Sequence, residues 1–274
     1  MRRRTLGRHC RAVLSYLEAG PHGEARGTLL CIHGYPESGH MWAPVVERAA
    51  QAGWHALAPD LPGYGDSPPD PPHTWQRMVD AVERFHAEHA GGPVALCVHD
   101  WGGLIGLRWA CEHPEHVRAL VISATGFFPD GKWHGLAKAM RTEGEGEQIV
   151  DGTTRQGFGQ MLAAVAPGIS EQSCDEYFKA YADPVRRRGQ LELYRSGDFA
   201  ELERYRGGLA ALDVPTLLLF GSEDPFARVA SAHRLAQEIP HARMEILDGV
   251  GHFMFDEVPE RAATIVVDFL RDLE

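Results

Sequence analysis

The sequence alternates short apolar runs with segments of helical periodicity, and this alternation constrains the fold more than any other feature. Four runs in the first half are almost continuously apolar, as are strands buried on both faces of a parallel sheet: 28–32, 55–59, 94–98 and 119–123. Three helical patterns follow such runs and end at glycine or proline: 42–52, 75–89 and 103–113. The alternation predicts right-handed β–α–β units, with helices on both faces of one sheet.

The alternation stops near residue 127 and resumes after residue 206. The segment between has helical stretches but no comparable strand-like run. It is too long for an unstructured loop in a compact domain, so we expect a helical cap over the carboxyl ends of the strands, where such sheets bind ligands. The sequence thus predicts a core at 1–126, a cap at 127–206 and the rest of the core at 207–274. This last part should hold two strands and two helices: 215–221, 229–238, 244–247 and 259–273.

Composition excludes several classes of function. The net charge of -11 argues against a nucleic-acid partner, which requires a basic surface. No apolar run approaches the roughly 20 residues that a membrane span needs, and no segment of signal length follows the basic start. The five cysteines show no metal-ligand spacing, and Cys31 and Cys97 lie inside apolar runs. We therefore expect a cytoplasmic protein with buried thiols, no metal and no cofactor, which acts on a small molecule. The arginine run at 186–188 is expected to be a solvated helix face.

The segment at 94–110 places a carboxylate where many hydrolases place a serine. An apolar strand runs into a sharp turn with Asp100 at its apex, and Gly102 and Gly103 begin the next helix. This is the pattern of a nucleophile elbow, in which small residues let the helix pack close to the sheet. The alternative is that Asp100 only caps the helix, a role that aspartate fills well.

Two further residues stand in the order of a catalytic triad. Asp224 follows the apolar run at 215–221, and His252 lies in a glycine-flanked loop before the last helix. The order nucleophile, acid, histidine is that of α/β-hydrolases. The other position for the acid, after the run at 119–123, offers no carboxylate. Asp100, Asp224 and His252 are therefore the candidate catalytic residues.

The motifs together resemble the α/β-hydrolase superfamily over nearly the whole chain. Within it the chain is similar to the aspartate-nucleophile branch: haloalkane dehalogenases, haloacetate dehalogenases and epoxide hydrolases. The residues that carry the resemblance are HGYP at 33–36, DLPGYGDS at 60–67, VHDWGG at 98–103, Asp224 and GHF at 251–253. The resemblance implies the α/β-hydrolase fold, a mostly parallel sheet flanked by helices, with a helical cap inserted after the sixth strand.

The resemblance also implies a mechanism. A carboxylate nucleophile suits displacement at a saturated carbon and forms an alkyl ester. His252, oriented by Asp224, would then activate the water that hydrolyses the ester. The oxyanion of this step would meet the backbone N–H groups of Tyr35 and Trp101.

Enzymes of the aspartate-nucleophile branch displace one of two main leaving groups, a halide or an epoxide oxygen. Val98, two residues before the nucleophile, favours a halide, whereas Trp101 fits either leaving group, because its indole could bind a halide and tryptophan at this position also occurs in epoxide hydrolases. Trp133 resembles a cap tryptophan that donates to halide in one dehalogenase subgroup, although it could equally be plain packing. Tyr194 matches an epoxide-hydrolase tyrosine and also a halide-contacting tyrosine of haloacetate dehalogenases. A second cap tyrosine, expected of epoxide hydrolases, is missing between residues 126 and 168.

The HGYPES stretch at 33–38 weighs in the other direction, since such sequences are frequent in epoxide hydrolases. On balance we expect hydrolysis of haloalkanes to alcohol and halide. Epoxide opening to diols is the alternative. A non-catalytic ligand-binding member of the fold is a third possibility, although such a protein would have no need of the complete triad.

Overall fold

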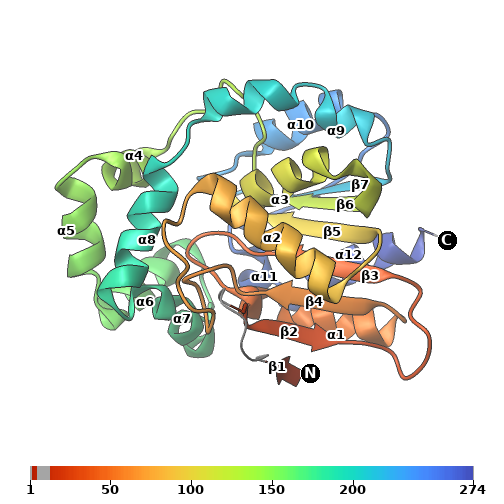
Figure 1. The fold of residues 1–274 in the computed structure, drawn as a ribbon, viewed down its shortest axis with the longest axis horizontal. Coiled ribbons are helices and arrows are strands. Elements are labelled where there is room, and N and C mark those ends of the chain that lie inside the picture. The colour runs from red at the N-terminus through yellow and green to blue at the C-terminus, as the bar shows by residue number, and fades with distance from the viewer. Residues whose placement is uncertain (1, 5–12, 274) are drawn as a thin grey trace.

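Eight strands form one mixed sheet in the computed structural model, which describes residues 2–4 and 13–273 (Figure 1). The order across the sheet is β1–β2–β4–β3–β5–β6–β7–β8. The six strands β3 to β8 pair in parallel with their neighbours in this group, whereas β2 pairs antiparallel with both β1 and β4. The strands are β1 (Arg2–Arg4), β2 (Tyr16–Ala19), β3 (Thr28–Ile32), β4 (His55–Pro59), β5 (Val94–His99), β6 (Val117–Ser123), β7 (Thr216–Gly221) and β8 (Arg243–Leu247).

Helices cover both faces of the sheet, as the alternating pattern predicts. On one face α1 (Ala43–Gln51) packs against α12 (Pro259–Arg271), and on the other α2 (Trp75–His89) packs against α3 (Trp101–Glu112) (Figure 1). Helix α10 (Val229–Glu238) connects β7 to β8 and packs on both. All six residues of β5 are buried, as expected for a central strand of a sheet covered on both faces.

The segment between β6 and β7 is helical. Five α-helices lie together beyond one end of the sheet: α4 (Gly135–Arg141), α5 (Glu145–Gly152), α6 (Arg155–Val165), α7 (Glu171–Phe178) and α8 (Pro184–Arg195) (Figure 1). The 3-10 helices η3 (Lys179–Tyr181) and η4 (Phe199–Tyr205) and the short α9 (Gly208–Ala211) complete the segment. We call α4 to α8 with η3 and η4 the inserted helices. None of the helices in the described part of the chain is long and apolar enough to cross a membrane.

The arginine run on α8 is not the solvated face that its sequence suggests. The guanidinium of Arg186 donates to the carbonyls of Gly63 and Ser67, at 2.8 Å each, in the loop after β4. Arg187 donates to the carbonyl of Tyr181, and of the three only Arg188 is exposed. The expectation was wrong chiefly because the partners of Arg186 are backbone carbonyls more than 100 residues away, which leave no trace in the local pattern. Cys31 and Cys97 are buried free thiols, as expected, and Cys10 lies outside the described residues.

Candidate active site

Asp100 occupies a sharp turn between β5 and α3. Its backbone has φ 48° and ψ -119°, a conformation that non-glycine residues rarely adopt and that is held by its surroundings. A Cβ on Gly102 would lie 2.3 Å from the carbonyl oxygen of Ile32, so only glycine allows this approach of helix to sheet. The hydroxyl of Thr125 fixes the turn by donating to the Asp100 carbonyl at 2.8 Å. The Asp100 side chain makes no capping bond to α3, and the helix-cap alternative is therefore wrong.

The structure brings Asp100, Asp224 and His252 together from the ends of three strands. Oδ1 of Asp100 accepts the backbone N–H of Tyr35 at 2.9 Å, and Oδ2 lies 3.5 Å from Nε2 of His252. On the other side of the imidazole, Nδ1 lies 2.7 Å from Oδ2 of Asp224. The second oxygen of Asp224 accepts two backbone N–H groups, from Phe226 and Ala227. Both oxygens of Asp224 are thus occupied, and its carboxylate holds the ring in one orientation.

The charges of the two carboxylates act on His252. Burial disfavours the charged imidazole, but Asp224 and Asp100 outweigh it and hold the pKa of His252 well above its usual value. Burial also disfavours the charged form of Asp100, and here the hydrogen bond and the charge of His252 prevail, so the pKa of Asp100 is lowered. Asp100 and His252 are therefore both ionised in the resting site at neutral pH.

Two adjoining pockets meet at Asp100. The first, which we call the His252 pocket, has a cavity volume of about 70 Å³. It is lined by Asp100, His252 and Tyr194, with apolar side chains from α6 and the two core loops: Met161, Leu162, Val165, Phe226 and Phe253. The second, the Trp133 pocket, has a cavity volume of about 150 Å³ and is lined by Asp100, Trp101, Trp133 and Phe199. The carboxylate is thus reached from a largely apolar space, which suits an uncharged substrate.

The expected substrate-binding residues lie beside Asp100 with different orientations. The rings of Trp101 and Trp133 stack at 5.8 Å and 27°. Trp133 donates its indole N–H to Asp198, at 3.3 Å. Trp101 meets Tyr194 edge to face at 5.0 Å. Burial and the charge of Asp100 raise the pKa of the Tyr194 hydroxyl, and a hydrogen bond from Trp101 opposes this. The N–H of Trp101 and the hydroxyl of Tyr194 therefore face each other near the nucleophile.

The backbone N–H groups of the two residues predicted to stabilise the oxyanion differ in their hydrogen bonding. The backbone N–H of Tyr35 already donates to Asp100. Trp101 is the first residue of α3, where N–H groups have no partner within the helix. Both groups are backbone donors at the nucleophile, and neither depends on the side chain.

The sequence did not predict the side-chain contacts of Tyr35 or the burial of Glu37 beside the site. The Tyr35 hydroxyl donates to Gln190 at 2.9 Å and lies 2.6 Å from the hydroxyl of Tyr181, so its side chain links the core loop to the inserted helices. Glu37 is fully buried behind the triad, with Oε1 3.5 Å from Nε2 of His99. Desolvation raises the pKa of Glu37 well above its usual value. Only the HGYPES motif could have pointed to either residue, and it gives no partner.

His33 braces the loop that carries Tyr35. Its Nε2 accepts the N–H of Leu61 at 2.9 Å, so Nδ1 carries the proton and donates to the carbonyl of Gly34. Burial lowers the pKa of His33 to about 4. The neutral ring therefore ties the loop that carries the Tyr35 N–H to the loop after β4.

Comparison with known proteins gives the family. Residues 27–259 match the model of the family described as alpha/beta hydrolase fold. The chain belongs to this family. A haloalkane dehalogenase of Mycobacterium marinum (strain ATCC BAA-535 / M) is 30% identical over 92% of this chain and 87% of its own length. The protein is therefore an α/β-hydrolase enzyme, and its resemblance to haloalkane dehalogenases is confirmed.

Two further comparisons bear on this α/β-hydrolase. A cis-3-alkyl-4-alkyloxetan-2-one decarboxylase of Xanthomonas campestris pv. campestris is 38% identical, over 43% of this chain and 41% of its own length. Among solved structures, a putative ancestral haloalkane dehalogenase covers 100% of this chain and 99% of its own, with a TM-score of 0.81 at 23% identity. This structural likeness confirms the expected fold.

Proposed function

We propose that this α/β-hydrolase displaces a leaving group at a saturated carbon through an ester on Asp100, and that its substrates are haloalkanes. The observation that carries the proposal is the pairing of an ionised carboxylate in the strained turn with the His252–Asp224 pair. One oxygen of Asp100 is held by the Tyr35 N–H, and the other is turned to His252. A ligand-binding protein without activity would not need the His252–Asp224 pair beside Asp100.

In the first step an oxygen of Asp100 attacks the substrate carbon. The new C–O bond forms as the carbon–halogen bond breaks, and the halide leaves with the bonding electrons. The lowered pKa of Asp100 keeps the nucleophile ionised. The indole N–H of Trp101 is the proposed donor to the departing halide, with the Tyr194 hydroxyl facing the same space. Trp133 is proposed as a wall of the substrate pocket, because its N–H is donated to the carboxylate of Asp198, whereas the N–H of Trp101 faces the uncharged hydroxyl of Tyr194, which a halide would replace as acceptor.

In the second step water hydrolyses the ester. Ester formation removes the negative charge of Asp100, one of the two carboxylates that raise the pKa of His252. The imidazole then loses its proton more easily and serves as the base that deprotonates the water. Hydroxide attacks the ester carbonyl carbon, and the backbone N–H groups of Tyr35 and Trp101 stabilise the oxyanion. The alcohol leaves, and Asp100 is restored with one oxygen from water.

Epoxide opening is the second candidate, because the Tyr194 hydroxyl lines the His252 pocket together with Asp100. Attack on an epoxide carbon leaves an alkoxide on the substrate, which needs a proton donor. Tyr194 is protonated at neutral pH, since burial raises its pKa well above the usual value, and it is the proposed donor in this reaction.

The test is a parallel assay with 1,2-dibromoethane, styrene oxide, a p-nitrophenyl ester and a cis-3,4-dialkyloxetan-2-one. We expect bromide release and no comparable turnover of the others. Styrene oxide opening without bromide release would replace the proposal by the second candidate. Turnover of the oxetanone alone would move the chain toward the Xanthomonas relative, and cleavage of the p-nitrophenyl ester alone would exclude displacement at saturated carbon.

The covalent step is tested with His252→Phe. This variant should form the ester on Asp100 and fail to hydrolyse it, because the base is missing. Intact-protein mass spectrometry should then detect one alkyl adduct per chain, absent in the double variant with Asp100→Asn. If no turned-over substrate leaves an adduct on His252→Phe, the ester mechanism is wrong.

A further inference from the structure

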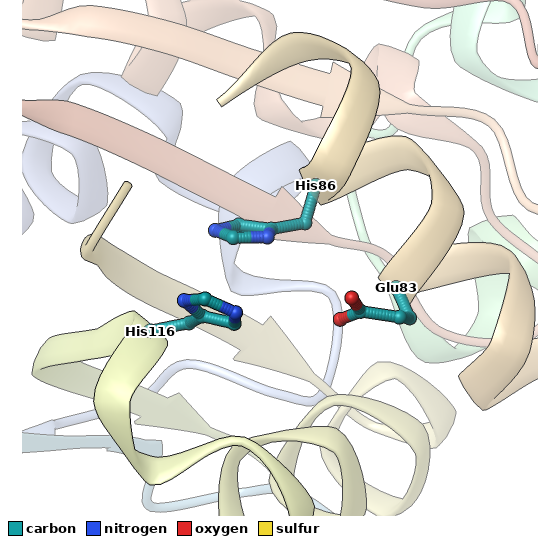
Figure 2. A group of neighbouring side chains, drawn as sticks. All are labelled: Glu83, His86 and His116. Carbon is teal, nitrogen blue, oxygen red and sulfur yellow. The ribbon is translucent and has the colours of Figure 1, made fainter. Parts of the chain in front are cut away.

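A second cluster of ionisable side chains lies between α2 and η2 (Pro114–His116), the 3-10 turn that follows α3. Glu83 and His86 come from α2, and His116 comes from η2. Figure 2 shows the three side chains pointing toward one another across the gap between these elements. One ligand atom from each lies within 4.8 Å of the others. We propose that Glu83, His86 and His116 bind a divalent transition-metal ion of the zinc type.

His86 carries most of the argument. It is buried, with 2% of its surface exposed. Its Nε2 lies 2.8 Å from the carbonyl oxygen of Gly92, which accepts only, so Nε2 carries a proton. Nδ1 has no hydrogen-bond partner among the described residues, and in the tautomer with its single proton on Nε2 it is a bare acceptor. A buried acceptor without a partner is costly, and Figure 2 shows this side of the ring facing Glu83 and His116.

The surroundings of these ligands are those of a metal site. Histidines that bind metals commonly donate the other ring N–H to a backbone carbonyl, which fixes the ring; the bond from His86 to Gly92 does this. Glu83 is fixed in the same way, because Oε2 accepts the indole N–H of Trp109 at 2.6 Å. The same oxygen lies 3.6 Å from Nε2 of His113, so Oε1 is the Glu83 oxygen that remains to serve as a ligand. Two imidazoles and one carboxylate form a donor set that zinc prefers, and that hard cations such as Mg²⁺ do not.

His116 completes the set and gives the ion access. Its ring lies 4.5 Å from that of His86, and its side chain is 32% exposed. Nitrogen ligands of a tetrahedral zinc ion lie about 3.3 Å apart, so His116 and Glu83 must move inward by at most roughly 1.5 Å on binding. His116 is only half buried and can do so by side-chain rotation, whereas Glu83 must loosen its hydrogen bond from Trp109 to move inward.

A neighbouring group, His113, Glu115 and His116, shares one residue with the proposed site. Its carboxylate belongs to Glu115, whose side chain is 65% exposed. This group contains no buried side chain. The set with His86 is therefore the one that the structure prepares for an ion.

The experiment uses tag-free, chelator-treated protein titrated with Zn²⁺ by calorimetry against a competing chelator. We expect one ion per chain and a rise in Tm of a few degrees, because the ion binds only the folded chain, with no effect of Mg²⁺. His116→Asn and Glu83→Gln should each weaken Zn²⁺ binding by about 100-fold. Glu115→Gln should leave it unchanged.

A matched control is His55→Asn, which removes a half-buried histidine paired with the single carboxylate of Glu18. It should leave Zn²⁺ affinity unchanged. Circular dichroism of each apo variant checks its fold. The proposal is wrong if Zn²⁺ does not saturate at one ion per chain, if Glu115→Gln weakens binding more than Glu83→Gln, or if His55→Asn weakens it as much as His116→Asn. The readout is independent of the proposed dehalogenation.

Discussion

His252 changes its task with the charge of its neighbour Asp100. In the resting site both neighbouring carboxylates raise the pKa of His252, and the imidazolium in turn lowers the pKa of Asp100. Each group therefore holds the other in the state that suits attack. In the proposed mechanism the ester of Asp100 carries no charge, and His252 then serves as a base. The 3.5 Å contact between Oδ2 and Nε2 would couple these two proposed steps.

This coupling predicts how pH divides the reaction. Attack needs ionised Asp100, whose pKa is lowered, so ester formation persists as the pH falls. Hydrolysis needs neutral His252, so it slows as the pH falls through the pKa of His252 in the ester state. We expect the ester to accumulate at acidic pH in the wild-type enzyme. Quenched-flow samples analysed by intact mass spectrometry measure this; an adduct that grows on going to alkaline pH would contradict it.

The two stacked tryptophans give a matched pair of variants. Trp101→Phe removes the N–H proposed to bind halide, whereas Trp133→Phe removes an N–H that is donated to Asp198. A hydrogen bond to a charged group is worth about 1.5–3 kcal/mol, so Trp101→Phe should slow bromide release by about 10- to 100-fold. Trp133→Phe should cost clearly less. If both variants released bromide equally slowly, both tryptophans would contribute to the halide site. If Trp101→Phe released bromide at the wild-type rate, Trp101 would not be the halide donor.

At the scale of elements, the sequence predicted the helices whose ends are marked by local capping residues and glycines. Helix α2 (Trp75–His89) was predicted to the residue, because Thr74 caps its first turn and glycines follow its end. Helix α3 begins at Trp101 and not at 103, since the sharp turn at Asp100 leads directly into it. Strands β1 and β2 were missed. β1 lies at the edge of the sheet with β2 beside it, and three or four residues are too few for a strand pattern to stand out in the sequence.

The contacts between elements could not be predicted in the same way. Tyr35, Arg186 and Glu37 each depend on a partner that only the folded chain brings near. The triad was accessible from sequence because strand ends of a parallel sheet meet at one edge. The orientation of the Trp133 N–H was not, because it depends on Asp198, 65 residues away.

Helices α7 and α11 (Met254–Glu257) give a prediction at this scale. The Tyr177 hydroxyl donates to Asp256 at 2.8 Å, and burial raises the pKa of Asp256 to about 6. A carboxyl group whose pKa is raised by folding stabilises the folded state in its protonated form. This contribution is complete below the unfolded pKa of 3.8 and is lost as the pH rises through about 6. Asp256→Asn removes the cost of ionisation and keeps an acceptor for Tyr177. Its free energy of unfolding relative to wild type should rise by about 2 kcal/mol between pH 4 and pH 8.

Urea denaturation at the two pH values measures this difference. Asp248→Asn, at an exposed position, should show no such pH dependence and is the control. A relative stability of Asp256→Asn that falls on going from pH 4 to pH 8 would mean that the ionised carboxylate stabilises the contact between α7 and α11.

At the scale of the whole molecule, the inserted helices are joined to the core at several separate places. Arg186 bonds the loop after β4, and Trp75 of α2 donates its indole N–H to the carbonyl of Leu193 on α8 at 2.9 Å. Tyr35 reaches Gln190, and Tyr177 reaches Asp256. The His252 pocket is likewise lined from both parts, by Phe226 of the core and by Met161 and Tyr194 of the inserted helices.

Such distributed contacts predict that the inserted helices and the core unfold together. Opening one part alone would break all of these bonds and expose the tryptophans between them, at a cost close to that of global unfolding. We expect the far-ultraviolet signal of the helices and the near-ultraviolet signal of Trp75, Trp101 and Trp133 to change in one coincident urea transition. Arg186→Gln should shift that transition to lower urea without splitting it. Two separated transitions in the wild-type enzyme would instead mean that the inserted helices form an independent lid over Asp100.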